Sequence, residues 1–165
     1  MERALTCCFT GHRPVKLPWG YDEDDPRCIA LKRKISDVID SLYCSGIRHF
    51  ISGMAEGCDL YFAEAVIAYR TEHEDVTLEA AVPFRGQASR WSFSQRMRYD
   101  RLISLCDSVK CMQEEYSRSC MLIRNRYMVD RSSVLLAIYD QTPGGTRHTL
   151  DYAAKKNLEI IIIQT

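Results

Sequence analysis

The stretch Ser52-Gly53-Met54-Ala55-Glu56-Gly57-Cys58-Asp59 decides the fold class of this chain, because it separates two segments of different pattern. Residues 48–51 form a short run typical of a strand, and residues 59–72 are nearly all apolar over a length typical of a helix. Ser52-Gly53 breaks the strand. Capping of the helix by Asp59 needs no ligand, but Glu56 and Asp59 would also lie where a ribose hydroxyl can be held.

Four further loops follow strand-like runs in the same way. They are Thr10-Gly11-His12-Arg13-Pro14, Pro83-Phe84-Arg85-Gly86, Arg124-Asn125-Arg126 and Gly144-Gly145-Thr146-Arg147-His148-Thr149. In an open parallel sheet, loops at the carboxyl ends of the strands share one edge, and ligands bind there. Glycines let the backbone approach a ligand, and a helix N-terminus behind such a loop favours a phosphate. The loops therefore predict a nucleotide-type ligand.

Strand-like and helix-like patterns alternate along the whole chain. Strands are predicted over 4–9, 48–51, 76–82, 108–112, 134–139 and 158–163, and helices over 31–46, 59–72, 87–106, 120–131 and 149–156. This order indicates parallel pairing through right-handed crossovers. We therefore expect an α/β fold, a three-layer α/β/α Rossmann-like domain with a mostly parallel sheet, in which residues 1–165 form a single domain.

Composition limits the partners that we expect. The chain is 46% apolar and 27% charged, as soluble globular proteins are, and its formal net charge is zero. Without a global field that attracts DNA or an anionic membrane, nucleic acid is expected to be an unlikely partner. The longest apolar stretch, 158–163, is too short to span a bilayer, and the first residues lack a signal-peptide pattern. We expect a cytoplasmic protein with no membrane partner.

The eight cysteines do not form a recognisable metal or disulfide pattern. No Cys-x-x-Cys occurs, and the four histidines are scattered without ligand spacing. Cys106, Cys111 and Cys120 are the nearest approach to a cluster, but their spacing matches no zinc site. Cys7, Cys8 and Cys111 fall inside predicted strands, where a free cysteine acts as a small buried hydrophobe. We predict reduced structural thiols, no metal and no resident cofactor.

Five arginines surround three aromatic residues in and just before the predicted helix 87–106. Arg85, Arg90, Arg96, Arg98 and Arg101 lie around Trp91, Phe93 and Tyr99. Such a pattern is typical of a stacking surface for single-stranded nucleic acid, and equally of a solvated cap whose aromatic residues pack inward. The zero net charge favours the solvated cap.

Taken in order, these segments resemble the SLOG superfamily, which joins the Smf/DprA DNA-processing proteins with the LOG phosphoribohydrolases. The segment 51–59 is similar to the Smf/DprA "SGxAxGxD" motif, and Arg124-Asn125-Arg126 with Ser132-Ser133 is similar to "RNRxIxxxS". Within the superfamily the chain most resembles the small stand-alone YpsA-like family. Thr10-Gly11-His12-Arg13-Pro14, Pro83-Phe84 with Trp91 and Tyr99, and Tyr139-Asp140 carry that resemblance.

The resemblance implies a Rossmann-like fold that binds nucleotides or nucleotide-derived molecules, often as a homodimer. The LOG enzymes carry a Pro-Gly-Gly-x-Gly-Thr-x-x-Glu motif whose glutamate takes part in cleaving an N-glycosidic bond. Here Thr149 falls at the position of that glutamate, and a threonine supplies no carboxylate. Arg124 coincides with the arginine that those enzymes use. Ligand binding is therefore implied more strongly than LOG chemistry.

These observations predict a sensor or regulator that binds a nucleoside monophosphate, ADP-ribose or an NAD-like molecule. The predicted ligand-binding residues are Thr10, Gly11, His12, Arg13, Ser52, Gly53, Glu56, Gly57, Asp59, Pro83, Arg124, Asn125, Gly144, Gly145, Thr146 and Thr149. One alternative is an N-glycosidic-bond hydrolase, with Glu56, Asp59 and Arg124 as candidate catalytic residues. A second alternative is a single-stranded DNA-binding module related to Smf/DprA. Whether the chain is an enzyme stays open.

Overall fold

A computed structural model of the chain describes residues 2–165, so Met1 of the predicted domain lies outside the described residues. All six strands are parallel and form one sheet in the order β4-β3-β2-β1-β5-β6. The strands are β1 (Thr6–Thr10), β2 (His49–Ser52), β3 (Thr77–Val82), β4 (Ser108–Cys111), β5 (Val134–Ile138) and β6 (Glu159–Ile163). The helices are α1 (Pro26–Cys44), α2 (Cys58–Arg70), α3 (Phe93–Leu105), α4 (Cys120–Asp130) and α5 (Gly145–Lys155), with short 3-10 turns at Arg3–Leu5 and Pro14–Lys16.

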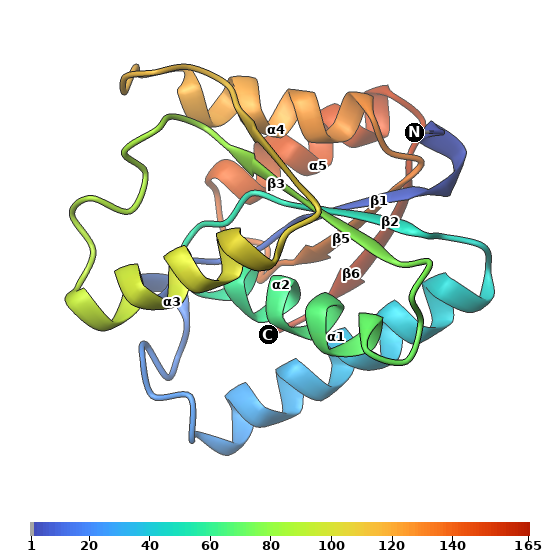
Figure 1. Ribbon diagram of the computed structural model, residues 1–165, viewed down its shortest axis with the longest axis horizontal. Coiled ribbons are helices and arrows are strands. Elements are labelled where there is room, and N and C mark those ends of the chain that lie inside the picture. Colours follow the sequence, from blue (N-terminus) through green and yellow to red (C-terminus); the bar gives the residue numbers. More distant parts are fainter. Residues whose placement is uncertain (1) are drawn as a thin grey trace.

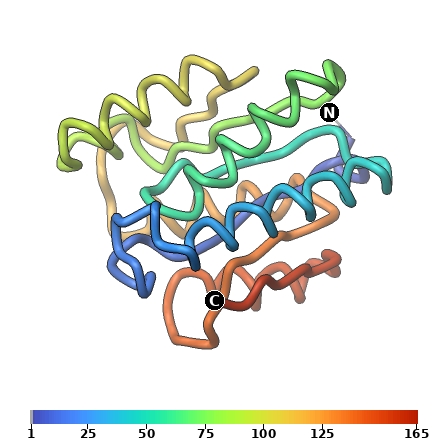
Figure 2. The backbone as a smooth tube through the Cα atoms, turned by 90° about the horizontal axis from the view of Figure 1, so that it is seen from below, coloured from blue at the N-terminus to red at the C-terminus, as the bar shows by residue number. Residues whose placement is uncertain are grey.

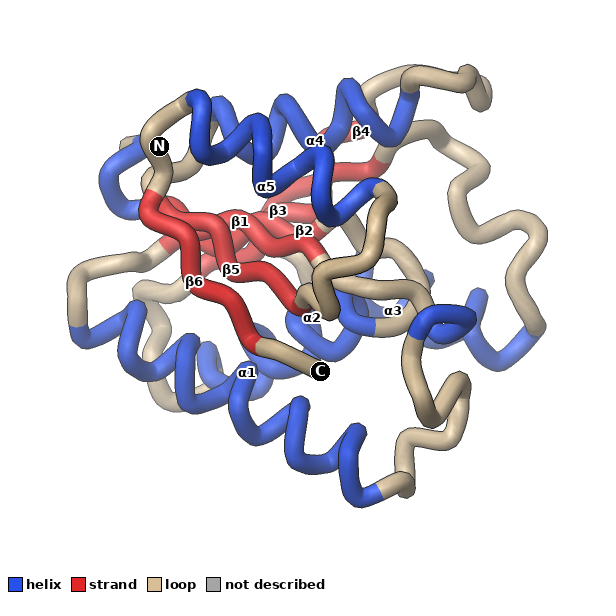
Figure 3. Tube along the Cα trace, turned by 180° about the vertical axis from the view of Figure 1, so that it is seen from behind, coloured by secondary structure: helices blue, strands red, loops and turns tan. Residues whose placement is uncertain are grey.

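Helices cover both faces of the sheet. Figure 1 shows α1, α2 and α3 on one face and α4 and α5 on the other, and Figure 3 shows the strands between these two layers. Alternation along β1 explains this arrangement, because Phe9 packs into the core beneath α1 and α2 while Cys8 packs beneath α4 and α5. Every residue of β1 and β5 is buried, as expected for parallel strands covered on both sides. The predicted three-layer α/β/α fold is confirmed.

The order of the strands reverses beside β1. The chain builds β1, β2, β3 and β4 outward in one direction and then returns to place β5 and β6 on the other side of β1. The register pairs Thr10 with Ala137, so the loops that follow β1 and β5 leave the sheet next to each other. A crevice at such a reversal is where ligands bind in open α/β sheets.

Helix starts differ most from the sequence predictions. Helix α1 begins at Pro26 rather than near Leu31, because the Asp25 carboxylate accepts a hydrogen bond from Arg27 N at 2.8 Å and proline is favoured in the first turn. Helix α3 begins at Phe93 rather than Gln87, with Ser92 as its cap. Helix α5 begins at Gly145, four residues before the predicted start, and this shift brings Thr146 into its first turn.

All eight cysteines lie within the described residues, and none is bonded to another. Cys7, Cys8, Cys28, Cys58 and Cys120 are buried, and burial raises the pKa of the Cys8 thiol to about 12. These five thiols pack as small apolar groups in the core, whereas Cys111, which the sequence predicts to be buried, is only half-buried. Among residues 2–165, none of the helices is both long enough and apolar enough to cross a bilayer.

Candidate ligand-binding site

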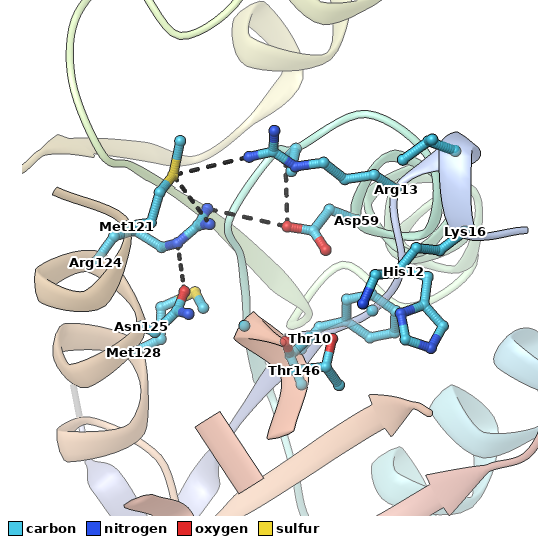
Figure 4. Close-up of a pocket in the computed structure, with 15 residues that line it drawn as sticks. Thr10, His12, Arg13, Lys16, Asp59, Met121, Arg124, Asn125, Met128 and Thr146 are labelled. Carbon is cyan, nitrogen blue, oxygen red and sulfur yellow. Dashed lines mark hydrogen bonds and ion pairs between the residues drawn. The ribbon is translucent and has the colours of Figure 1, made fainter. Parts of the chain in front are cut away.

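A cavity of about 290 Å³ opens at the carboxyl end of β1 (Figure 4). Its walls come from the loop after β1, the start of α2, one side of α4 and the first turn of α5. The lining residues are Phe9, Thr10, Gly11, His12, Arg13, Val15, Lys16, Ala55, Asp59, Met121, Arg124, Asn125, Met128, Gly145 and Thr146. The cavity therefore lies at the strand reversal, where the topology favours a ligand.

Many of the residues singled out in the sequence lie around this cavity. They are Thr10, Gly11, His12, Arg13, Asp59, Arg124, Asn125, Gly145 and Thr146. Segments as distant in sequence as 10–13 and 145–146 thus meet at one edge of the sheet. Their roles in binding stay predictions.

The loop between β2 and α2 is held by its own polar side chains. Ser52 Oγ accepts a hydrogen bond from Met54 N at 3.1 Å and donates to the Asp59 carbonyl oxygen at 3.0 Å. The Asp59 carboxylate accepts from Ala55 N at 3.2 Å, so it stabilises the turn before the helix rather than capping its first residue. The N-cap position is Gly57, whose φ of 85° favours glycine.

Arg124 joins this loop to α4. Its Nη1 donates to the Gly53 carbonyl oxygen, and its Nε donates to Asn125 Oδ1 at 2.7 Å. Nη1 also lies 4.0 Å from Asp59 Oδ2. Burial lowers the pKa of Arg124 and raises that of Asp59, and the attraction between the two charges opposes both shifts. A buried cation and a buried carboxylate thus face the cavity as a pair.

His12 connects the loops that follow β1 and β5. Its Nε2 lies 2.9 Å from Asp140 Oδ1. The Thr142 hydroxyl, followed by weaker effects that include His12, lowers the pKa of Asp140 to about 2. Nearby, Lys16 Nζ donates to the Pro143 carbonyl oxygen at 2.9 Å. These contacts fix the two loops against each other beside the first turn of α5.

The first turn of α5 faces the cavity without a side-chain cap. Its N-cap residue is Gly144, which has no side chain that could cap the helix. Backbone N–H groups of this turn are therefore open to a ligand. Thr146 lies in this turn and lines the cavity together with Thr10 (Figure 4). Thr149 lies one turn further on, where it accepts from Asn125 Nδ2 and donates to the Gly145 carbonyl oxygen, both at 2.9 Å. Thr149 therefore supports the wall without lining it.

Some predicted ligand-binding residues do not line the cavity. Ser52, Gly53 and Gly57 stand behind its wall, and Gly144 precedes the helix that forms it. Pro83 ends β3 and is not part of the lining. Glu56 accepts a hydrogen bond from the Tyr21 hydroxyl at 3.1 Å instead. Asp59 is thus the single carboxylate among the described residues that line the cavity.

Sequence reasoning missed Phe9, Val15, Lys16, Ala55, Met121 and Met128 as lining residues. Met121 and Met128 precede and follow Arg124 by three and four positions on α4, which is the spacing of one helix face. That spacing is a usable signal, because the sequence predicts Arg124 as a ligand-binding residue. Lys16 enters through the 3-10 turn Pro14–Lys16, and no pattern in the sequence predicts it.

The arginine cluster lies away from the cavity, and several of its charges are compensated. Arg98 pairs with both Glu23 and Glu64, Arg101 with Glu64, and Arg85 with Glu114. Trp91 packs edge-on against Tyr99, with ring centroids 5.3 Å apart. Among residues 2–165, Arg90 and Arg96 form no ion pair with a carboxylate. No three potential metal ligands are grouped in the described part of the chain.

Comparison with known proteins identifies the family of this chain. The YpsA model, described as the YspA SLOG family, matches residues 7–164. The chain belongs to the YpsA SLOG family. It is 32% identical over 147 residues to the SPbeta prophage-derived protein YoqJ of Bacillus subtilis, covering 81% of this chain and 86% of that protein. It is also 29% identical to a UPF0398 protein of Bacillus thuringiensis, over 92% of this chain and 83% of the relative.

Solved structures relate this YpsA-family chain to the DprA fold. DprA of Streptococcus pneumoniae superposes with a TM-score of 0.66 at 14% identity, over 96% of this chain and 50% of DprA. DprA of Helicobacter pylori superposes with a TM-score of 0.65 at 14% identity, over 97% of this chain and 65% of that protein. The chain therefore spans less than two thirds of either DprA protein.

The expectation that nucleic acid is an unlikely partner is wrong. It rested on the zero net charge, but the DprA of Helicobacter pylori, which shares the fold, is described as binding single-stranded DNA. Net charge sums the whole surface, whereas nucleic acid needs only a local basic groove. A neutral chain of this fold does not exclude such a partner.

Proposed function

We propose that the chain binds a nucleotide or nucleotide-derived ligand in the cavity, with a phosphate at the first turn of α5, as a sensor or regulator. The observation that carries this proposal concerns two hydroxyl groups. Thr10 and Thr146 are 7% and 8% exposed, line the cavity and make no side-chain hydrogen bond within residues 2–165. Neither hydroxyl is among the buried polar atoms that lack a partner, so both are open to the cavity and can bond a molecule that fills it.

Charge and size support a small phosphorylated molecule. Lys16 lies beside the α5 turn, and its Nζ bonds a carbonyl oxygen rather than a carboxylate, so its charge is uncompensated. The helix N-terminus adds to the attraction for an anion. A volume of about 290 Å³ is near the lower limit of ligand pockets, which favours a nucleoside monophosphate over a dinucleotide such as NAD.

Calorimetric titration tests this proposal with AMP, other nucleoside monophosphates, ADP-ribose and NAD. Adenosine, which lacks the phosphate, serves as the ligand control. We expect AMP to bind and adenosine to bind at least about tenfold more weakly. Lys16→Ala and Thr146→Val should weaken AMP binding, whereas Arg85→Ala removes a charge outside the cavity and should not. Folded protein that binds none of these ligands would contradict the proposal.

Hydrolysis of an N-glycosidic bond is a second candidate function of the same cavity, and it would depend on Asp59. This residue is buried, its pKa is raised by that burial, and no other carboxylate lines the cavity within the described residues. A raised pKa suits a general acid. Release of free base from nucleoside monophosphates or NAD would support hydrolysis. Activity that survives in Asp59→Asn would exclude this mechanism.

Single-stranded DNA binding is a further candidate, favoured by the likeness to DprA and by the two unpaired arginines. Arg90 and Arg96 flank Phe93, which is 71% exposed and available for stacking on a base. Fluorescence anisotropy with a labelled oligonucleotide should show affinity that declines steeply with salt. The double variant Arg90→Ala/Arg96→Ala should bind less, and Arg147→Ala is the matched surface control. Absent or salt-insensitive binding excludes this function.

A further inference from the structure

The end of the cavity opposite α5 contains two arginines that converge on one methionine. Arg13 Nη2 lies 3.9 Å from Met121 Sδ, and Arg124 Nη2 lies 3.8 Å from the same sulfur atom. Figure 4 shows this group, with Asp59, on one side of the cavity, while Thr10, Thr146 and Lys16 lie on the other. The two arginines are therefore separate from the phosphate position proposed at α5.

The sulfur atom is a poor partner for these cations. A thioether is only a weak acceptor, whereas each guanidinium carries strong, directional donors. Arg124 uses Nη1 and Nε on Gly53 and Asn125, which leaves Nη2 facing Met121. Arg13 is exposed, and its one side-chain hydrogen bond within residues 2–165 is to Met121. The buried Nη2 of Arg124 thus points at a group that cannot satisfy it, and the exposed guanidinium of Arg13 reaches the same sulfur atom.

The positive charges around the sulfur atom are only partly compensated. Both guanidinium groups approach the same sulfur atom, and after burial the charge of Arg13 is one of the causes that lower the pKa of Arg124. Asp59 lies 4.0 Å from Arg124 and compensates one of them, so the three groups together carry one positive charge when ionised. An anionic oxygen in the place of the sulfur would bond both guanidinium groups at the shorter distances typical of charged partners.

Met121 is able to move aside. It is half-buried at the cavity wall, and its unbranched side chain rotates about three bonds. We propose that Met121 covers a second anion position between Arg13 and Arg124, so that the preferred ligand carries two separate anionic groups. This proposal rests on the nucleotide-binding function proposed above. Its ligand class is a nucleotide phosphorylated on both sides of the sugar, such as a nucleoside 3′,5′-bisphosphate.

The first test compares AMP with adenosine 3′,5′-bisphosphate by calorimetry. We expect the bisphosphate to bind at least about tenfold more tightly, because a guanidinium–phosphate bond is among the strong hydrogen bonds. Arg13→Gln should remove this advantage, so that the ratio of the two affinities falls to within about twofold of one. Met121→Ala should increase the preference, and Met121→Leu, which keeps the bulk, should not. AMP binding without any preference for the bisphosphate overturns the second position and leaves the proposed function intact.

The second test does not depend on nucleotides. In protein labelled with ¹³C at the methionine methyl groups, inorganic phosphate should shift the Met121 signal, which Met121→Leu identifies. The shift should persist in Thr146→Val and be lost in Arg13→Gln. A Met121 signal that phosphate does not move contradicts the proposal. If AMP fails to bind but the Arg13-dependent shift is present, the anion position stands and the nucleotide function fails.

Discussion

At the scale of single residues, Arg124 is the side chain on which the cavity wall depends. It links α4 to Gly53 on the opposite loop, 71 positions earlier in the chain, while being 6% exposed. Such a close approach between a guanidinium and a backbone leaves no room for a side chain at Gly53. A Cβ atom there would lie 2.0 Å from Arg124 Nη1 and 2.8 Å from Asp59 Oδ2.

Gly53→Ala should therefore destabilise the fold by about 1–3 kcal/mol, because overpacking forces Arg124 out of its site. Urea denaturation followed by circular dichroism measures this change. Gly86→Ala is the matched control, since its Cβ would meet no atom closer than 3.6 Å. Equal stability of the two variants would show that Arg124 is not held as described.

Asp140 gives a prediction on pH. Its pKa of about 2 lies below the ordinary value of about 3.9 for an unfolded chain, so its ionised form favours folding. That contribution to the free energy of unfolding is complete above about pH 4 and is lost as the pH falls towards 2. Urea denaturation of the wild type and Asp140→Asn across this window should show the difference between them shrinking on acidification. A difference that does not change with pH contradicts this assignment.

At the scale of elements, residues 11–25 between β1 and α1 carry Arg13 and Lys16 to the cavity and are anchored at their far end by Glu23. Its carboxylate pairs with Lys32 on α1 and Arg98 on α3, and Arg98 also bonds Glu64 on α2, at 2.7 Å from Nη2. Figure 2 shows this loop, in dark blue, beside the start of α1. One half-buried ion network thus joins the loop to three helices.

Glu23→Gln should lower stability by about 1–2 kcal/mol, because it leaves Lys32 unpaired and Arg98 with one partner instead of two. Hydrogen exchange of residues 14–25 should accelerate, while exchange in α5 stays unchanged. The matched control is Glu114→Gln, whose partner Arg85 is 72% exposed and whose loss should have little effect. Equal effects of both variants would show that the network does not anchor the loop.

Element boundaries also show where sequence reasoning succeeds. The strands were predictable because β1, β2 and β5 are short apolar runs that end at glycine or polar loops. The start of α5 was not, since Gly-Gly-Thr-Arg-His has weak helical propensity and becomes helical through tertiary packing. The position of Glu56 was missed for a related reason, because its direction depends on Tyr21 in a distant loop.

At the scale of the whole molecule, the topology accounts for what was predictable about the site. Parallel strands bring their carboxyl-end loops to one edge, so the meeting of residues 10–13 with 145–146 followed from the order of the elements. The direction of each side chain could not be predicted from that order. Lys16 faces the cavity because of the local 3-10 turn, and Met121 faces it because of its position around the axis of α4. Single-domain organisation and a homodimer stay predictions, and light scattering on a size-exclusion column tests the dimer.

Cooperative unfolding tests the single domain. Both core clusters share the strands of one sheet, so we expect them to unfold together. Trp19 lies in the loop before α1 and Trp91 before α3, and their fluorescence should change at the same urea concentration as circular dichroism. A fluorescence transition at lower urea would show that a loop opens independently of the sheet.

The reversal of strand order beside β1 has a consequence during synthesis on the ribosome. The first four strands can pair as they emerge, but β1 gains its second neighbour only when residues 134–137 leave the exit tunnel. The cavity needs residues 145–146 as well. Nascent chains arrested before that point should hold no ligand, and β1 should expose an unpaired flank that attracts chaperones until translation is nearly complete.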